Sequence, residues 1–84
     1  MAHTRQEIHA ELATIIQDVT GISAAEVTPD KTFIDDLDID SLSMVEIGVA
    51  LQDTLGVEIP DDDLIKIKTV GDFLDHVERL QTAS

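Results

Sequence analysis

The sequence predicts an all-α protein, a four-helix bundle in which a long loop joins the first two helices and the third helix is short. Two observations lead to this prediction. Apolar residues recur at helical spacing in four stretches of the chain. Residues that typically start or stop helices stand at the ends of these stretches. The 84 residues suffice for one small domain, which we expect to span residues 1–84.

The first helix is predicted from Thr4 to Thr20. Thr4 and Glu7 have the spacing of a capping box, and Gly21 stands where a left-handed residue would end the helix. Between these signals, one apolar stripe is expected to face the core; it consists of Ile8, Leu12, Ile15, Ile16 and Val19.

The segment from Ile22 to Asp40 is predicted to be a long loop, because its apolar residues show no sustained period. It contains Pro29, and its residues 23–27 are compatible with a short turn. Loops of this length in compact domains are usually functional or disordered. Spaced apolar anchors are expected to pin this loop to the core, with Phe33 pointing inward; they are Ile22, Val27, Phe33 and Leu37.

The second helix is predicted from Ser41 to Leu55, with Asp40 as its N-cap and Gly56 as its stop. Its apolar residues form two stripes. One is expected to face the core and contains Met44, Ile47, Gly48, Leu51 and Leu55. The other lies beside it and contains Leu42, Val45 and Val49. From the pattern alone, the second stripe either broadens the buried face or forms a partly exposed face for a ligand or partner.

Two more helices are predicted in the last third of the chain. Asp61–Asp63 open a short helix, with acids at its positive end, and its apolar residues are Leu64, Ile65 and Ile67. The fourth helix is predicted from Val70 to Leu80, after a capping pair formed by Thr69 and Asp72. Its apolar face consists of Val70, Phe73, Leu74, Val77 and Leu80.

The chain is strongly acidic, with a net charge of −13 from 18 acids and 5 bases. This charge disfavours nucleic acids and anionic membranes as partners and favours proteins with basic docking patches. Crowded carboxylates at Asp35–Asp40 and Asp61–Asp63 are expected to raise some carboxyl pKa values by repulsion.

We expect neither a signal peptide nor a membrane span, because the sequence has no basic leader and no apolar run of the required length. It also contains no cysteine, which fits a cytoplasmic protein without disulfides. Any thioester chemistry would therefore need a thiol that the polypeptide does not supply.

A serine hydrolase is not predicted. Ser41 lies in Asp-Ser-Leu, without a G-x-S-x-G or S-x-x-K motif around it. His3, His9 and His76 lie near the chain ends or on other predicted helices, and we expect them to be solvent-facing helix residues. No catalytic residue is predicted.

A specific metal site is not predicted either. Asp36, Asp38 and Asp40 alternate as in an EF-hand loop, but Ser41 replaces the sixth-position glycine and Ile47 the twelfth-position glutamate. A structural zinc site would need cysteines or paired histidines. Weak binding of divalent cations by the clustered carboxylates stays open.

With hydrolase and metal-binding roles set aside, Ser41 is considered as a site of covalent attachment. In the first turn of a helix its hydroxyl would be exposed, and the backbone N–H groups there favour a phosphate. The surrounding acids would keep a phosphate-linked arm from lying down on the surface. The alternative is that Ser41 is an ordinary first-turn residue, because serine after aspartate is common at helix starts.

The segment around Ser41 resembles the phosphopantetheine attachment motif of acyl carrier proteins. The motif "DSL" opens a helix after "FIDDLDID", and matching segments follow one another along nearly the whole chain: "VTGI", "VTPDKTFIDDL", "DSLSMVEI", "GVEIPDDDL" and "TVGDFLDHV". Asp38 departs from the L-G-x-D-S-L pattern of many carriers, in which glycine takes its place. The segment "DDLDIDSLSMVE" is instead similar to carriers of actinobacterial dissociated (type II) fatty-acid synthases, particularly the mycobacterial meromycolate-extension carriers.

The resemblance implies a non-catalytic carrier of growing acyl chains. Ser41 matches the serine that receives 4'-phosphopantetheine from coenzyme A, and Asp40 and Leu42 match its flanks. The arm would supply the thiol for the thioesters. The second stripe would line a pocket for the acyl chain or touch enzymes. The residues expected to dock partners are Met44, Val45, Glu46, Val49 and Asp53.

The implied partners of this cytoplasmic monomer are a phosphopantetheinyl transferase, malonyl transacylase, ketoacyl synthases, ketoacyl reductase, dehydratase and enoyl reductase. A carrier of a polyketide or peptide synthase would share the fold and the serine. A small acidic cation-binding or adaptor protein without a prosthetic group is the alternative from another class. The intact mass of protein from a cell that contains the transferase separates the carriers from this last alternative.

Overall fold

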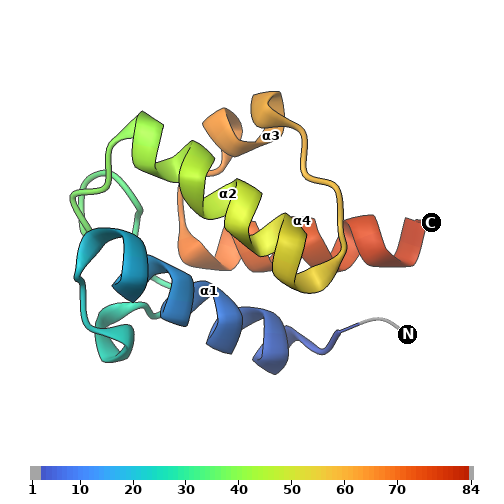
Figure 1. The fold of residues 1–84 in the computed structure, drawn as a ribbon, viewed down its shortest axis with the longest axis horizontal. Coiled ribbons are helices and arrows are strands. Elements are labelled where there is room, and N and C mark those ends of the chain that lie inside the picture. The colour runs from blue at the N-terminus through green and yellow to red at the C-terminus, as the bar shows by residue number, and fades with distance from the viewer. Residues whose placement is uncertain (1–2, 84) are drawn as a thin grey trace.

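The computed structural model describes residues 3–83, without the side chains at positions 61, 65, 82 and 83. Figure 1 shows an all-helical arrangement, in which α1 and α2 pack together and α3 lies beside α2. The elements in chain order are α1 (Arg5–Thr20), the short 3-10 helix η1 (Ala24–Glu26), α2 (Ser41–Leu55), α3 (Asp61–Lys66) and α4 (Val70–Ala83). The predicted four-helix fold with a short third helix is confirmed. The prediction for the Ile65 side chain lies outside the described residues.

The first helix is set by its predicted caps. The Glu7 N–H donates to Thr4 Oγ1 and the Thr4 N–H donates to Glu7 Oε1, each at 3.1 Å. Gly21 ends the helix with a φ of 81°, which is left-handed backbone. Val19 was predicted to be in the core stripe but is 37% exposed. It belongs to the last turn, beyond the buried part of the stripe.

The predicted starts of α2 and α4 are also correct. Asp40 caps α2, and Asp72 and Thr69 exchange hydrogen bonds at the start of α4. α4 extends three residues beyond the predicted end at Leu80. The Gln81 side chain explains this difference, because its amide exchanges two hydrogen bonds, of 2.8 and 3.0 Å, with the main chain of His3.

The long loop between α1 and α2 is fixed to the core, as its apolar anchors predicted. Phe33 is 1% exposed, and its ring packs edge-on against Phe73 of α4 with centroids 5.8 Å apart. Backbone hydrogen bonds also join the loop to the start of α4, from the Phe33 N–H to the Lys68 carbonyl and from the Val70 N–H to the Lys31 carbonyl. Ile22 is partly buried, and the other buried apolar residues of the loop are Val27, Leu37 and Ile39.

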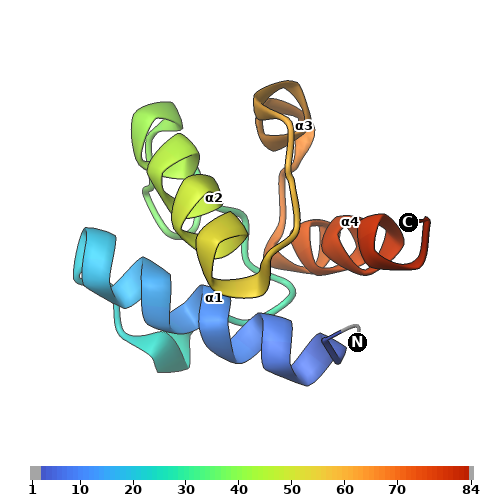
Figure 2. The same cartoon turned by 45° about the vertical axis from the view of Figure 1, so that its right-hand side comes forward.

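The short helix α3 lies next to α2 and above α4 (Figure 2). Its Leu64 packs into the space that Gly48 leaves on α2. A Cβ atom at Gly48 would lie only 2.5 Å from Leu64 Cδ1, so the close approach of the two helices depends on this glycine. Because α3 lies this close to α2, its residues form one wall of any pocket that opens between the two helices.

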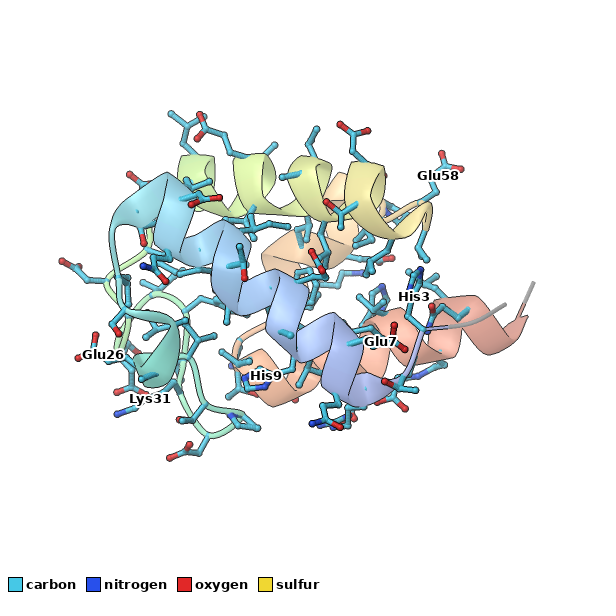
Figure 3. The ribbon with its side chains drawn as sticks, turned by 60° about the horizontal axis from the view of Figure 1, so that its bottom comes forward. His3, Glu7, His9, Glu26, Lys31 and Glu58 are labelled. Carbon is cyan, nitrogen blue, oxygen red and sulfur yellow. The ribbon has the colours of Figure 1, made fainter. Side chains whose placement is uncertain are left out.

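The three histidines were predicted to face solvent, but the structure shows them only partly exposed. Each is partly buried and hydrogen-bonded to another part of the chain. Figure 3 shows His3 before α1 and His9 on α1. His3 contacts the Leu55 carbonyl, His9 contacts the Val27 carbonyl, and His76 contacts the Asp63 carboxylate. The prediction rested on the positions of these residues near the chain ends or on separate predicted helices, and such positions do not reveal tertiary contacts.

Candidate functional site

Ser41 is the first residue of α2, and its side chain is exposed. The Asp40 carboxylate before it accepts a hydrogen bond from the Ser43 N–H at 2.8 Å. This bond lowers the pKa of Asp40, because the amide stabilises the ionised carboxylate. The shift is opposite to the rise that we expected from charge crowding in the Asp35–Asp40 segment. The helix start therefore presents a serine hydroxyl beside an ionised, hydrogen-bonded N-cap.

The acidic segment before Ser41 is an ordered turn. The Asp36 carboxylate accepts from the Thr32 N–H at 2.8 Å, and the Ile39 N–H donates to the Phe33 carbonyl at 2.8 Å. Asp38 has a φ of 55°, the only positive φ outside glycine among the described residues. The residue that departs from the L-G-x-D-S-L pattern thus occupies left-handed backbone, which glycine adopts freely and aspartate tolerates better than most residues.

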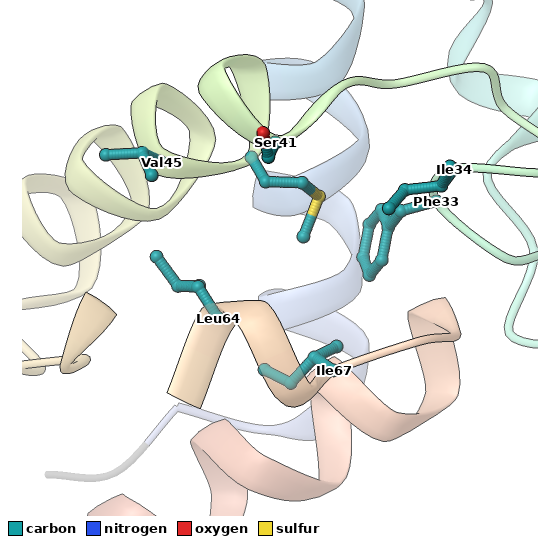
Figure 4. A pocket seen from close by; sticks show the side chains of 7 residues that line it. Phe33, Ile34, Ser41, Val45, Leu64 and Ile67 are labelled. Carbon is teal, nitrogen blue, oxygen red and sulfur yellow. The ribbon is translucent and has the colours of Figure 1, made fainter. Parts of the chain in front are cut away.

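A small apolar pocket of about 80 Å³ lies beside Ser41. Figure 4 shows Ser41 and Val45 on α2 at one side of this space, Leu64 and Ile67 at the opposite side, and Phe33 between them at one end. The complete lining comes from the loop (Phe33, Ile34), α2 (Ser41, Met44, Val45), α3 (Leu64) and the residue that follows α3 (Ile67). The serine is the one hydroxyl among these seven residues, so the pocket places a polar attachment point next to an apolar interior.

The second apolar stripe of α2 is not part of a broad buried face. Leu42 is 70% exposed and Val49 is 47% exposed, whereas Val45 is half-buried and lines the pocket. Met44 was predicted to be a docking residue, but it is only 5% exposed. Its side chain points into the core and the pocket, where a partner protein cannot reach it from the surface.

Acidic residues accompany the exposed stripe. Glu46 and Asp53 are exposed and recur at helical spacing with Leu42 and Val49, so that these four residues share one face of α2. The face combines apolar groups with negative charge. Among the described side chains, no group of three or more acids and histidines is arranged to hold a metal ion.

Sequence reasoning missed part of the pocket. It did not assign Ile34, Leu64 or Ile67 to a ligand space. The available signal for Ile34 was an apolar residue beside Phe33 in an otherwise acidic segment, and the structure leaves it 60% exposed. Leu64 and Ile67 gave no such signal, because their role depends on how α3 packs against α2.

A comparison with protein families matches residues 10–77 to the family described as "Phosphopantetheine attachment site". The match covers most of the chain, including the loop, α2 and α3, so the chain belongs to this family of phosphopantetheine-bearing carriers. Its relatives narrow the class to the acyl carrier proteins. The match to this family confirms the predicted cofactor, 4'-phosphopantetheine.

The relatives are similar over almost the whole chain. An acyl carrier protein of Rhodococcus erythropolis is 57% identical over 96% of this chain and 89% of its own length. The meromycolate extension acyl carrier protein of Mycolicibacterium smegmatis is 58% identical over 96% of this chain and 82% of its own. The solved structure of the acyl carrier protein from Enterococcus faecalis is 40% identical, with a TM-score of 0.72 over 89% of this chain and 95% of that one.

An acyl carrier protein is a non-catalytic carrier, as the sequence predicted. It works with a phosphopantetheinyl transferase and with the enzymes of fatty-acid synthesis. The comparisons thereby exclude the alternative of an acidic cation-binding or adaptor protein without a prosthetic group. None of the described helices has the length and apolar character needed to cross a membrane.

Proposed function

We propose that Ser41 carries the 4'-phosphopantetheine arm and that this chain presents acyl thioesters to the enzymes of a dissociated fatty-acid synthase. One observation carries the proposal. Ser41 combines an exposed hydroxyl at the start of α2 with a place at the edge of the apolar pocket. Asp40 and Leu42 flank it as in the attachment motif. The arm, when bound, supplies the thiol that the polypeptide lacks.

The residues around Ser41 fit a phosphodiester. α2 has 15 residues, and the N–H groups of its first turn attract a phosphate. The Asp40 carboxylate is held by the Ser43 N–H. The remaining acids of the segment, Asp35, Asp36 and Asp38, are exposed and repel an arm that lies down on them. The arm should therefore reach outward or toward the pocket.

The two uses considered for the second stripe of α2 are divided between its residues. Val45 lines the pocket, where it would contact an acyl chain. Leu42 and Val49 are exposed and would contact partner enzymes, with Glu46 and Asp53 supplying charge. A small apolar strip with an acidic border suits a transient interface, because charge speeds encounter and the strip contributes short-range contact.

The proposed partners are a phosphopantetheinyl transferase, malonyl transacylase, ketoacyl synthases, ketoacyl reductase, dehydratase and enoyl reductase. We place the carrier with them in the cytoplasm, as a monomer. The meromycolate extension carriers of mycobacteria, at 54–58% identity, favour extension of long acyl chains as the pathway. Elongation assays with purified ketoacyl synthases, supplied with short or long acyl primers, test this pathway.

Intact mass measurement tests the attachment site. The wild type, Ser41→Ala and Ser43→Ala are each incubated with a phosphopantetheinyl transferase and coenzyme A. The wild type and Ser43→Ala should each gain one phosphopantetheine group, and Ser41→Ala should gain none. Serine and alanine differ by only a few tenths of a kcal/mol in helix propensity, so the melting temperature of Ser41→Ala should change little. A gain of the arm by Ser41→Ala would contradict the assignment.

A further inference from the structure

α3 depends on its neighbours for its position. It has six residues, and its N-cap, Pro60, offers no side-chain hydrogen bond. A helix this short is not stable alone in water. Leu64 holds it against Gly48 of α2. The same Leu64, with Ile67 directly after the end of α3, forms one wall of the pocket beside Ser41 (Figure 4). The position of α3 therefore decides the width of the pocket.

A polar contact joins α3 to α4 immediately beside this wall. The ring Nε2 of His76 lies 2.9 Å from Oδ2 of Asp63, and the two side chains are 23% and 31% exposed. His76 stands on α4 between Phe73 and Val77, both 0% exposed in the core. Because its neighbours are buried in the core, the backbone of His76 stays in place when α3 moves. An outward shift of α3 would stretch the contact.

The pocket is too small for a long chain in this arrangement. Its volume is about 80 Å³. An apolar cavity of about 150 Å³ accommodates benzene, which has six carbons. A chain of eight carbons can enter only if the pocket widens, and the separate short helix α3 is the wall that can move.

We propose that Asp63 and His76 form a latch that holds α3 in the narrow position and so limits the length of acyl chain that the pocket shelters. This inference rests on the proposed attachment of the arm to Ser41. Because the latch is made in the narrow state and stretched in the wide one, its loss shifts the population toward the wide state.

The loss of the latch should leave the protein folded. Asp63 and His76 line a hollow of about 250 Å³ that is open to solvent, together with Lys66, Asp72 and Asp75 among others. Water can therefore solvate Asp63 when its partner is removed, and no charge is left buried without a partner.

Hydrogen exchange on the unloaded protein tests the latch itself. In His76→Leu the amides of residues 64–66 in α3 should exchange about tenfold faster relative to those of α1, the factor expected for one lost hydrogen bond. His76→Gln keeps a donor and should restore most of the protection. His9→Leu is the matched control, since it removes another partly buried histidine that contacts Val27 rather than α3. Equal α3 exchange in wild type and His76→Leu would overturn the latch, and so would faster exchange in His76→Gln than in His76→Leu.

Thioester reactivity tests its effect on chain length. A phosphopantetheinyl transferase loads wild type and His76→Leu with butyryl or octanoyl groups from the acyl coenzyme A, and hydroxylamine then cleaves the thioesters. The octanoyl thioester should react several-fold more slowly in His76→Leu, where the wider pocket shelters it better, and the butyryl thioester equally in both. Equal octanoyl rates would refute the effect on chain length. A failure to load any protein would instead refute the attachment chemistry, while the exchange result on unloaded protein still stands.

Discussion

Asp38 is the residue at which the attachment segment departs from glycine, and its left-handed backbone makes that departure testable. The φ of 55° costs an L-residue steric energy that glycine avoids. We expect Asp38→Gly to raise the free energy of unfolding by about 0.5–1 kcal/mol, after the greater unfolded-state entropy of glycine is subtracted. Urea denaturation at neutral pH measures this change.

Two control variants separate conformation from charge at this position. Asp38→Asn removes the same charge near Asp36 and Asp40 but keeps a residue that tolerates left-handed backbone, so its gain should be smaller. Asp38→Ala should lose about 1 kcal/mol, because alanine lacks this tolerance. If asparagine and glycine stabilise equally, charge repulsion rather than backbone strain explains the effect.

Asp40 predicts a specific response to acid. Its folded-state pKa lies below the ordinary value of 3.8, because the Ser43 N–H stabilises the carboxylate. A lowered folded pKa contributes stability that is present above the unfolded value and is lost as pH falls through the folded one. Asparagine caps helices as well as aspartate does but does not titrate. Wild type should therefore lose stability relative to Asp40→Asn as pH falls below about 4.

Urea denaturation of both proteins at pH 7, 5, 4 and 3 measures this response. The comparison with Asp40→Asn cancels the titration of the other acids, including Glu7 and Asp30, whose pKa values are also lowered by hydrogen bonds. A difference between the two proteins that stays constant over this pH range would contradict the role assigned to the Ser43 N–H.

The contact between α2 and α3 depends on Gly48. A Cβ atom there would lie 2.5 Å from Leu64 Cδ1, so Leu64 must move when alanine is introduced. Overpacking costs about 1–3 kcal/mol, and the better helix propensity of alanine returns about 1 kcal/mol. We expect Gly48→Ala to lower the free energy of unfolding by about 1 kcal/mol, measured by urea denaturation.

A double-mutant cycle identifies Leu64 as the cause. Leu64→Ala alone should cost about 2–5 kcal/mol as a buried truncation. It should cost less in the Gly48→Ala protein, because the new methyl group occupies part of the space left by leucine. Additive effects of the two substitutions would show that the clash is relieved elsewhere.

Helices were predictable here wherever local chemistry sets their ends. The residues that cap α1 and α2 act on neighbouring backbone, so the sequence alone located these helices. They are the pair Thr4 and Glu7, and Gly21, Asp40 and Gly56. The end of α4 was missed because Gln81 contacts His3 at the other end of the chain. Local signals describe a helix, but tertiary contacts decide how far it extends.

The site was predictable only in part for the same reason. Ser41 was singled out by its motif and by the predicted helix start. The pocket beside it requires α3 to lie against α2, and no periodicity contains that information. Met44 and Val45 are neighbours in one apolar helix, yet one is buried and the other only half-buried. The direction in which each side chain leaves a helix can be derived from the sequence, but the positions of the neighbouring helices cannot.

For the whole molecule, the negative charge is a long-range feature and the apolar strip a local one. The net charge of −13 attracts any basic partner. Specific docking requires charge placed beside apolar surface, and on α2 the exposed Leu42 and Val49 have Glu46 and Asp53 beside them. These two contributions can be separated by making the same charge reversal at two different positions on the surface.

Glu46→Lys tests the docking face. We expect it to lower kcat/KM for malonyl transfer by about fivefold, because it removes an attraction and adds a repulsion toward a basic patch. Glu26→Lys is the matched control. It makes the same change in net charge on η1, which lies away from α2 in Figure 3, and should have a smaller effect. Both glutamates are exposed, so neither substitution should shift the melting temperature appreciably.

Salt completes the test. Added salt screens exposed charges, with a Debye length of about 8 Å at 0.15 M. It should slow malonyl transfer to the wild type and reduce its advantage over Glu46→Lys. Val49→Ala keeps every charge, so it should reduce transfer at all salt concentrations while costing little stability. If Glu26→Lys slows transfer as much as Glu46→Lys does, only overall charge matters. The exposed face of α2 is then not the docking surface.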